Sequence, residues 1–485
     1  MKIDRRTFIG AMGAAAVARR APAAGRDGVE VNDVHARLSR TRVHQVLTPS
    51  RPDDVTAAVE AAARSGRAVS VCGGRHSMGG QPFGAGTTLL DVRRLDRMIR
   101  LDPDAGLVEV EAGIQWPALL ARLAEAQPGE PRPWAIRQKQ TGADRLTLAG
   151  ALSSNIHSRG LAMAPFVGDV ESFAMVDASG RTRRCSRTEN PELFRLACGG
   201  YGLFGVVTAL TLRLARRQKL ERVVEIGTTD DLVERVQRRV ADGYLYGDFQ
   251  FAIDPASDDF LRKGVFCCYR PAPPSARVDE ARKELSGEDW GRLIRLAHVD
   301  KTRAFQEYSA YYLSTNGQYH WSDTHQLSFY LDGYHTAIDA DSTGSEMLAE
   351  VYVPRPRLEL LLSELRRAFR ANGASIPYGT IRFIEKDEET FLPWARERYA
   401  CIVFNLHVPG GTDGEARTAD AFRTLIDRAL AHGGSYYLTY HRYARRDQVL
   451  AAYPQFPAFL AAKRRLDPEE RFQSDWYRHY RSVFA

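Results

Sequence analysis

Three segments rich in glycine and other small residues constrain the fold most strongly, and the first and third lie beside a predicted strand. They cover residues 72–80, 147–157 and 199–207. Glycine lets the backbone approach a ligand closely, and successive backbone N–H groups can form a concave site for an anion. The first segment lacks the G-x-G-x-x-G spacing of a Rossmann fingerprint, and no helix is predicted directly after it. The pattern predicts a pyrophosphate-binding loop outside the Rossmann fold, with a plain tight turn as the alternative.

The order of predicted helices and strands indicates an α+β fold rather than a doubly wound sheet. Residues 53–214 alternate short helices and strands without a uniform βαβ rhythm. From about Arg217 onward the helices are longer, which predicts a second domain. We expect helices at 53–64, 116–125, 191–198, 358–371, 416–431 and 458–466. We expect strands at 68–72, 87–92, 107–111, 173–177, 205–214, 249–253, 347–353 and 399–408.

Composition excludes several classes of protein. The chain has 485 residues, enough for two or three domains at about 150 residues each. Hydrophobic residues make up 44% of it, so a disordered chain is excluded. No run of about 18 apolar residues occurs, so we expect no transmembrane helix. The net charge of +7 falls to +3 without residues 1–24, and the arginines are spread among acids, so we expect no nucleic-acid partner.

The first 24 residues resemble a bacterial twin-arginine signal. Arg5 and Arg6 precede a weakly apolar run at 11–18, and the small residues 21–24 offer a cleavage site. The resemblance predicts a periplasmic or secreted protein that is exported already folded, with its cofactor bound. The alternative is an uncleaved basic N-terminus.

The cysteines and histidines do not predict a metal site. None of the six cysteines forms a C-x-x-C pair, and we interpret them as buried small hydrophobic residues. His320 and His325 are five residues apart, a spacing that suits neither one helix face nor one strand face.

Taken in order, the three glycine-rich segments resemble the flavoproteins of the vanillyl-alcohol oxidase family. The resemblance covers most of residues 40–216 and returns near the C-terminus, where 466–475 is similar to the family's closing D-P-x-x-x-F-x-S turn. It implies a two-subdomain FAD-binding domain of the PCMH type at 40–216 and an α+β substrate (cap) domain at 217–430. Residues 431–485 would return to the FAD-binding domain.

The same resemblance implies FAD as cofactor and assigns residues to it. The first loop would bind the pyrophosphate, and His76 would carry the flavin through a covalent 8α-histidyl bond. The second segment would line the flavin, the third would support the adenine end, and Tyr437 would contact the cofactor. The implied cofactor-binding residues are Cys72, Gly73, Gly74, Arg75, His76, Ser77, Gly142, Thr147, Gly150, Ser154, Asn155, Ile156, His157, Val206, Val207 and Tyr437.

The second segment is most similar to that of aldonolactone oxidases, alditol oxidases and decaprenylphosphoryl-ribose oxidases. In the strand 350–354, this likeness makes Glu350 a candidate proton acceptor with Tyr352 beside it. Arg382 would approach the substrate. Tyr440 stands where several relatives have a lysine, which leaves the substrate open. The alternative for Glu350 is a glutamate exposed at the edge of a sheet, and the alternative for Arg382 is a solvent-exposed arginine on a strand. Neither would have a catalytic role.

These residues predict an FAD-dependent oxidoreductase acting on a CH–OH group of a sugar, sugar lactone or polyol-like substrate. Hydride would pass to flavin N5 while Glu350 or Tyr440 helps to remove the hydroxyl proton. Oxygen or another acceptor would reoxidise the flavin, and Ile156 would limit oxygen access if it lies beside the reactive flavin carbon. The alternatives are a tailoring oxidase for a natural product or amine, and an exported flavin-binding protein without turnover.

Overall fold

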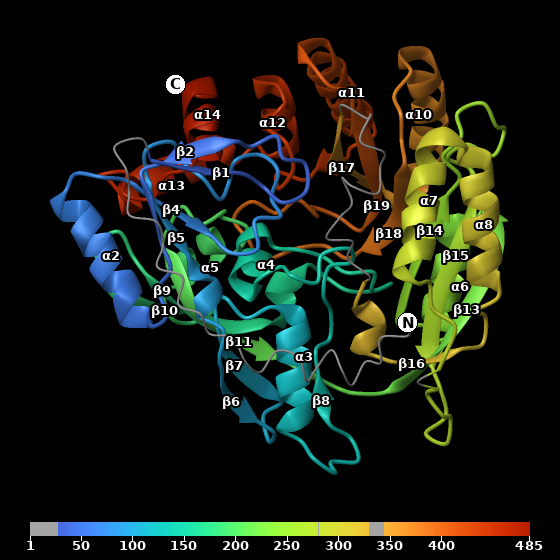
Figure 1. Cartoon of the computed structure of the whole chain (residues 1–485), viewed down its shortest axis with the longest axis horizontal. Coiled ribbons are helices and arrows are strands. Elements are labelled where there is room, and N and C mark those ends of the chain that lie inside the picture. Colours follow the sequence, from blue (N-terminus) through green and yellow to red (C-terminus); the bar gives the residue numbers. More distant parts are fainter. Residues whose placement is uncertain (1–27, 280, 329–343) are drawn as a thin grey trace.

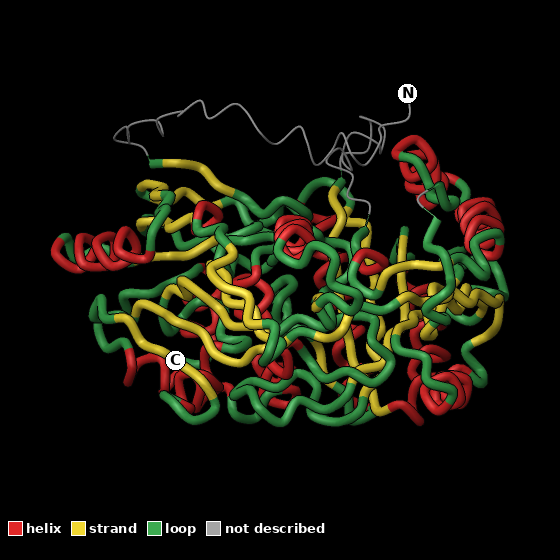
Figure 2. Tube along the Cα trace, turned by 90° about the horizontal axis from the view of Figure 1, so that it is seen from below, coloured by secondary structure: helices red, strands yellow, loops and turns green. Residues whose placement is uncertain are grey.

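The computed structural model describes residues 28–279, 281–328 and 344–485, and it divides into two regions (Figure 1). Short sheets from the first half of the chain form one region, and one large sheet from the second half forms the other. Figure 2 shows the same division after a 90° turn, with α2 at one end and α7 and α8 at the other. The predicted export signal at 1–24 lies outside the described residues.

The first region begins with a three-stranded parallel sheet in the order β3-β5-β4. Helix α2 packs on it, burying Val55, Val59 and Ala62 in one apolar cluster with Val69 and Leu90. The helix begins with a proline followed by two aspartates, residue types that suit a helix N-terminus. These elements are β1 (Val29–Val31), β2 (Thr41–Val43), β3 (Gln45–Leu47), α2 (Pro52–Arg64), β4 (Val69–Cys72), β5 (Thr88–Asp91) and η1 (Val92–Arg94).

A five-stranded antiparallel sheet, in the order β10-β9-β11-β7-β6, completes the first region. This part of the chain also contains a two-stranded sheet, β12-β8. The helices and strands here are β6 (Met98–Asp102), β7 (Leu107–Glu111), α3 (Trp116–Glu125), β8 (Trp134–Ala135), α4 (Leu148–Ser154), η2 (Phe166–Asp169), β9 (Val170–Val176), β10 (Thr182–Ser186), α5 (Pro191–Ala197), β11 (Val206–Arg213) and β12 (Ala215–Arg216). Helix α4 lies between this sheet and the second region (Figure 1).

The second region is built on an eight-stranded sheet in the order β16-β13-β15-β14-β18-β19-β17-β20. Helices α10 and α11 pack against β17, and α8 packs against β13 and β15. The elements are β13 (Lys219–Thr228), α6 (Leu232–Ala241), β14 (Tyr246–Phe251), β15 (Lys263–Pro271), α7 (Gly287–Val299), α8 (Lys301–Leu313), β16 (Tyr319–Trp321), η3 (Thr324–Gln326), β17 (Ser345–Pro354), η4 (Arg355–Arg357), α10 (Leu358–Asn372), β18 (Tyr378–Ile384), β19 (Tyr399–Val408), α11 (Thr412–Ala431) and β20 (Ser435–Tyr436).

Side-chain alternation along β17 separates the core from the candidate site. Met347, Ala349 and Val351 point to one face and are buried in the apolar core. Glu346, Glu350 and Tyr352 point to the other face, yet they are buried as well. Because β17 lies between β19 and β20, Glu350 is not an exposed edge residue.

The end of the chain returns to the first region through α12 (Arg446–Ala452), α13 (Phe456–Leu466) and α14 (Asp475–Val483). The backbone N–H of Val69 donates to the Arg471 carbonyl at 2.6 Å, and that of Gln473 donates to the Val69 carbonyl at 2.9 Å. The Asp467 carboxylate holds the turn between α13 and this contact, since it accepts from the N–H groups of Arg471 and Phe472 at 2.8 Å each. The closing turn thus hydrogen-bonds to β4.

Most predicted elements appear within a few residues of their expected bounds, but two differences matter. The second segment contains a helix, α4, which Thr147 caps and Asn155 ends with a φ of 46°. Helices α7 and α8 and strands β13 and β15 were not predicted. All six cysteines are buried and unpaired, as interpreted from the sequence. In the described part of the chain, no helix is both long and apolar enough to cross a membrane.

Candidate active site

The loop that follows β4 presents backbone donors. Arg75 adopts a left-handed conformation with a φ of 61°, its carbonyl accepts from Val34 N at 3.0 Å, and its guanidinium contacts Asp91 at 3.1 Å. Within the described residues, the N–H groups of Gly74, Arg75 and Ser77 have no protein acceptor. Such a run of free amides at the end of a strand is suited to an anion.

The backbone of the first segment packs directly against residues at and just before the start of the second segment. A Cβ atom added at Gly73 would lie 2.0 Å from Thr147 Oγ1, and one at Gly74 would lie 2.5 Å from the Arg145 carbonyl oxygen. Both distances are far below van der Waals contact, so the two glycines are required for this approach. Cys72 turns away into the core, and burial raises the pKa of its thiol to about 12.

His76 lies on the same loop, close to Arg145 and Lys139. Burial lowers the pKa of His76 to about 4, although a hydrogen bond with the Arg145 backbone acts in the opposite direction. The imidazole is therefore neutral near pH 7, the state in which a ring nitrogen has a lone pair for bond formation. The covalent flavin link through His76 stays a prediction.

The second and third segments pack together around α4. Gly199 N donates to the Leu152 carbonyl and Tyr201 N to the Ser153 carbonyl, both at 3.0 Å. Tyr437 OH donates to the Ser154 carbonyl at 2.6 Å, which joins the C-terminal part of the chain to the same helix. The other members of these segments include Gly150, inside α4, and the buried Ile156 just after it.

Three of the expected cofactor residues hold positions that the sequence did not suggest. The Asn155 side chain donates to Asp387 at 2.9 Å and accepts from Val167 N at 3.0 Å, so it ties the two regions together. Gly142 N donates to Ser328 Oγ at 2.9 Å. His157, which was expected to line the flavin, contacts Glu350.

Val206 and Val207 lie at the start of β11, where they pair with Val176 and Met175 of β9. On its other side β11 pairs with β7 only from Ala209 onward. Within the described residues, the backbone of Val206 and Val207 therefore has a neighbouring strand on one side alone. This position is compatible with the expected support of the adenine end.

Glu350 is the centre of a buried hydrogen-bonded cluster, and its side chain is 2% exposed. Its Oε1 lies 2.5 Å from His157 Nε2 and 3.2 Å from Cys401 Sγ, and it also accepts from the Tyr352 hydroxyl. Its Oε2 accepts from the Tyr440 hydroxyl at 3.1 Å. A carboxylate has about four acceptor sites in total, so Oε1 is fully used while Oε2 retains capacity.

The electrostatics of the cluster favour a charged Glu350. Burial acts to raise the pKa of the carboxyl, but the His157 charge and the hydrogen bonds from His157 and Tyr352 lower it to about 2. Burial and the Glu350 charge raise the pKa values of Tyr352 and Tyr440 well above 10. The environment thus moves the Tyr440 pKa away from neutrality, and which of Glu350 and Tyr440 takes up the hydroxyl proton stays a prediction. In the structure, the Tyr440 hydroxyl donates to Glu350 Oε2.

Arg382 approaches the cluster from the neighbouring strands. It pairs with Cys401 across β18 and β19, and Cys401 pairs with Tyr352 across β19 and β17. Arg382 is 7% exposed, so it is not the solvated arginine of the alternative interpretation. Its guanidinium donates to Thr141 Oγ1, whereas its Nε–H has no hydrogen-bond partner in the described part of the chain.

Sequence reasoning missed two buried groups near these residues. Cys401 donates to Glu350, but within a strand of apolar residues its thiol carries no distinguishing signal. Lys139 is fully buried and pairs with Asp144 at 2.6 Å. It lies in a stretch with no motif, so only its burial identifies it.

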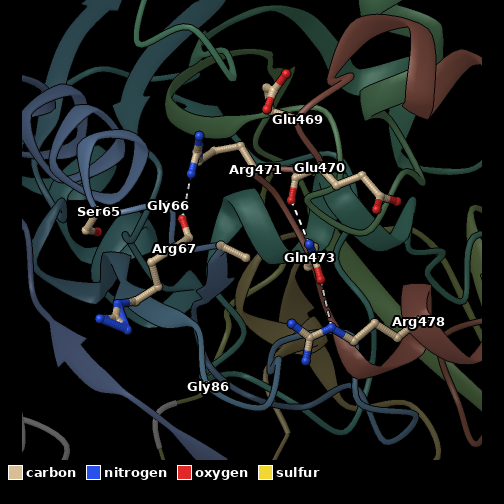
Figure 3. A pocket seen from close by; sticks show the side chains of 10 residues that line it. Ser65, Gly66, Arg67, Gly86, Glu469, Glu470, Arg471, Gln473 and Arg478 are labelled. Atoms are coloured by element: carbon tan, nitrogen blue, oxygen red, sulfur yellow. Dashed lines mark hydrogen bonds between the residues drawn. The ribbon is translucent and has the colours of Figure 1, made fainter.

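A separate surface cavity of about 380 Å³ lies at the opposite end of β4 from the glycine loop (Figure 3). Arg67, Arg471 and Arg478 line it together with Glu469 and Glu470. The guanidiniums of Arg471 and Arg478 are already bonded to backbone carbonyls and to a glutamine side chain. It contains none of the expected site residues.

Comparisons with known proteins support the expected cofactor. A family model described as an FAD-binding domain matches residues 43–186. L-gulono-1,4-lactone dehydrogenase of Mycobacterium tuberculosis is 22% identical over 444 residues, which cover 89% of this chain and 95% of that protein. L-gulonolactone oxidase of Bos taurus is 20% identical over 438 residues, or 87% and 92%. An uncharacterized oxidoreductase of the fasciation locus of Rhodococcoides fascians is 27% identical over 237 residues, and the match spans about half of each chain, 49% and 52%.

The described residues fit this cofactor. The backbone N–H groups of Gly74, Arg75 and Ser77 are available as donors to a diphosphate. At Gly73, the close packing against Thr147 leaves no room for a side chain. The chain therefore contains an FAD-binding domain of the PCMH type, with an α+β second part.

Proposed function

We propose that this FAD-binding oxidoreductase oxidises the CH–OH carbon of a sugar lactone, or of a related sugar or polyol. The observation that carries the proposal is the buried Glu350 carboxylate, with one oxygen still able to accept. Two relatives that match nearly the whole chain are named for gulonolactone, which supports the same class of substrate.

Bound FAD would supply the acceptor for the hydride. The residues of this chain would handle the hydroxyl group. Glu350 Oε2 accepts the hydroxyl proton, because Oε1 is already occupied by three donors. Tyr440 donates to the same oxygen and fixes its direction. The unpartnered Nε–H of Arg382 donates to a hydroxyl or carbonyl oxygen of the substrate.

The direct test is anaerobic bleaching of the flavin absorbance with a panel of sugar lactones, polyols and amines. We expect a lactone such as L-gulono-1,4-lactone, or a polyol, to reduce the flavin. Bleaching by an amine alone would instead assign a tailoring oxidase. Polyol binding without bleaching would assign a flavin-binding protein without turnover. Mixing reduced enzyme with oxygen, or with an artificial acceptor, then identifies how the flavin is reoxidised.

Covalent attachment at His76 is part of the proposal. The neutral, partly buried imidazole on the pyrophosphate loop supports it. After acid precipitation, we expect the flavin to remain with the wild-type protein and to be released from His76→Ala. Flavin release from both proteins would remove the link and leave FAD binding itself intact.

Export through the twin-arginine pathway is also proposed, on the basis of Arg5 and Arg6. A fusion of residues 1–40 to a folded reporter tests it. We expect the reporter outside the cytoplasm, and retention inside after Arg5→Lys with Arg6→Lys. Equal distribution of both fusions would contradict the proposal.

A further inference from the structure

A second cluster of metal-binding side chains lies apart from Glu350 and its partners. It consists of His298 in the last turn of α7, Glu346 on β17 and His407 on β19. Glu346 and His407 are direct partners across the two strands, so their side chains share one face of the sheet. Glu346 precedes Glu350 by four residues, a distance of about 13 Å along a strand. This cluster is therefore a separate site.

The geometry of the cluster suits one metal ion. Glu346 Oε1 lies 2.9 Å from His407 Nδ1 and 3.5 Å from His298 Nε2. Ligand atoms about 2.0–2.1 Å from a tetrahedral zinc ion lie roughly 3.3 Å from one another. The Glu346–His407 separation is slightly shorter than this value, and the Glu346–His298 separation is slightly longer. The three ligand atoms all lie within 4.8 Å of one another, so shifts of the two histidine side chains would bring them to bonding distance.

Two buried polar atoms of the cluster have no hydrogen bond. Glu346 is fully buried, and within the described residues its Oε2 has no donor, nor does His298 Nε2 have a hydrogen-bond partner. The neighbouring cation Lys301 donates to the carbonyls of Ala297 and Ile376 at 2.6 and 3.0 Å, not to Glu346. A metal ion held by His298 Nε2 and by both oxygens of Glu346 would satisfy the two orphaned atoms, as buried polar groups normally require.

We propose that His298, Glu346 and His407 bind a divalent transition-metal ion. Two imidazoles and a carboxylate are a donor set typical of Zn²⁺, with the remaining position open to water. The ion joins α7 to the neighbouring strands β17 and β19, and it thereby stabilises the second region. The three ligands are 48 and 61 residues apart along the chain, so no local spacing could indicate them.

The test uses the full-length, FAD-loaded protein after treatment with a chelator and buffer exchange. Titration with Zn²⁺ in a calorimeter, and with Co²⁺ in a spectrophotometer, measures affinity and coordination. We expect one bound ion per chain, a tetrahedral Co²⁺ spectrum, and a higher melting temperature with Zn²⁺. His298→Ala and His407→Ala should each weaken binding by more than the roughly 10–100-fold typical of losing an outer-shell partner. Flavin absorbance reports that each variant has folded.

His432→Ala is the matched control. His432 also faces a carboxylate, with 3.3 Å between its Nε2 and Glu364 Oε1, but this pair belongs to no three-ligand cluster of the described residues. We expect it to bind Zn²⁺ like the wild type. No binding by the wild type would overturn the proposal, as would equal binding by His407→Ala, which would place the ion elsewhere, for example at His157, Glu350 and Cys401.

Discussion

The two regions of this molecule present their chemistry in opposite ways. Around the loop after β4, the main features are those of the backbone: amides without a backbone acceptor in the described residues, and glycines that allow two segments to touch. On the eight-stranded sheet, side chains from β17, β19, the segment after β20 and residue 157 hydrogen-bond to one carboxylate. The loop of the first arrangement is a short stretch of consecutive residues, whereas the second arrangement exists only after distant strands have paired.

The largest expected effect is on the side-chain region. Glu350→Gln keeps the shape of the side chain but removes the proton acceptor, so we expect flavin reduction to slow by about 10²–10⁴-fold. Stopped-flow absorbance under anaerobic conditions measures this rate. The visible spectrum of the oxidised flavin should be retained, because the backbone cradle is untouched. Glu388→Gln, at an exposed site, is the control. An equal loss of flavin-reduction rate in both variants would contradict a specific role for the Glu350 carboxylate.

The converse change in the backbone region is Gly73→Ala. The added Cβ would lie 2.0 Å from Thr147 Oγ1, so we expect weakened FAD binding and a loss of at least about 1–3 kcal/mol in unfolding free energy. Flavin content and chemical denaturation measure the two effects. Gly291→Ala is the control, since nothing lies within 4 Å of its added Cβ and α7 should gain about 0.5–1 kcal/mol. Full flavin occupancy in Gly73→Ala would show that the close approach is dispensable.

Tyr440→Phe should have a smaller effect. It removes the hydroxyl that donates to Glu350 Oε2 and leaves the acceptor in place. A hydrogen bond to a charged group is worth about 1.5–3 kcal/mol, so we expect flavin reduction to slow by roughly 10–100-fold. A rate as low as that of Glu350→Gln would mean that Tyr440 is itself the proton acceptor.

The smallest expected effect is a pH dependence of stability. Burial lowers the pKa of His441 to about 3, below its ordinary value near 6.5. Between these values the unfolded chain binds a proton that the folded chain does not, so stability is complete above pH 6.5 and falls as the pH decreases toward 3. His441→Gln should flatten this part of the melting-temperature profile, by at most about 1.4 kcal/mol per pH unit. Profiles that are parallel in both proteins would contradict it.

The comparison also explains which features the sequence could predict. The expected bounds of β7, α3 and β19 agree with the structure, because their hydrophobic periodicity and helix starts are local signals. Helix α8 was missed because its apolar face is weak and, among its described residues, only Ala304 is buried. Helix α7 has a clear apolar face and a capping box at Ser286, so its sequence did carry a signal that was overlooked. Helix α4 was missed because its small residues are typical of loops as well.

For the candidate site, the sequence indicated residues that lie in motifs but not the contacts between them. The structure brings Glu350, Tyr352 and Tyr440 together and places Arg382 on a neighbouring strand, and their catalytic roles stay predictions. The resemblance assigned His157 to the flavin, and the structure shows it in contact with Glu350. Glu350 and His157 are 193 residues apart, and their contact depends on how the eight-stranded sheet meets α4. Only the folded topology determines such a pair.

The hydrogen bonds from Arg471 and Gln473 to β4 have a consequence for the order of assembly. The strand that carries the glycine loop lacks this neighbour until residues 471–473 have been synthesised. We therefore expect a chain truncated before Arg471 to hold its pyrophosphate loop less firmly, because β4 would lose both hydrogen bonds.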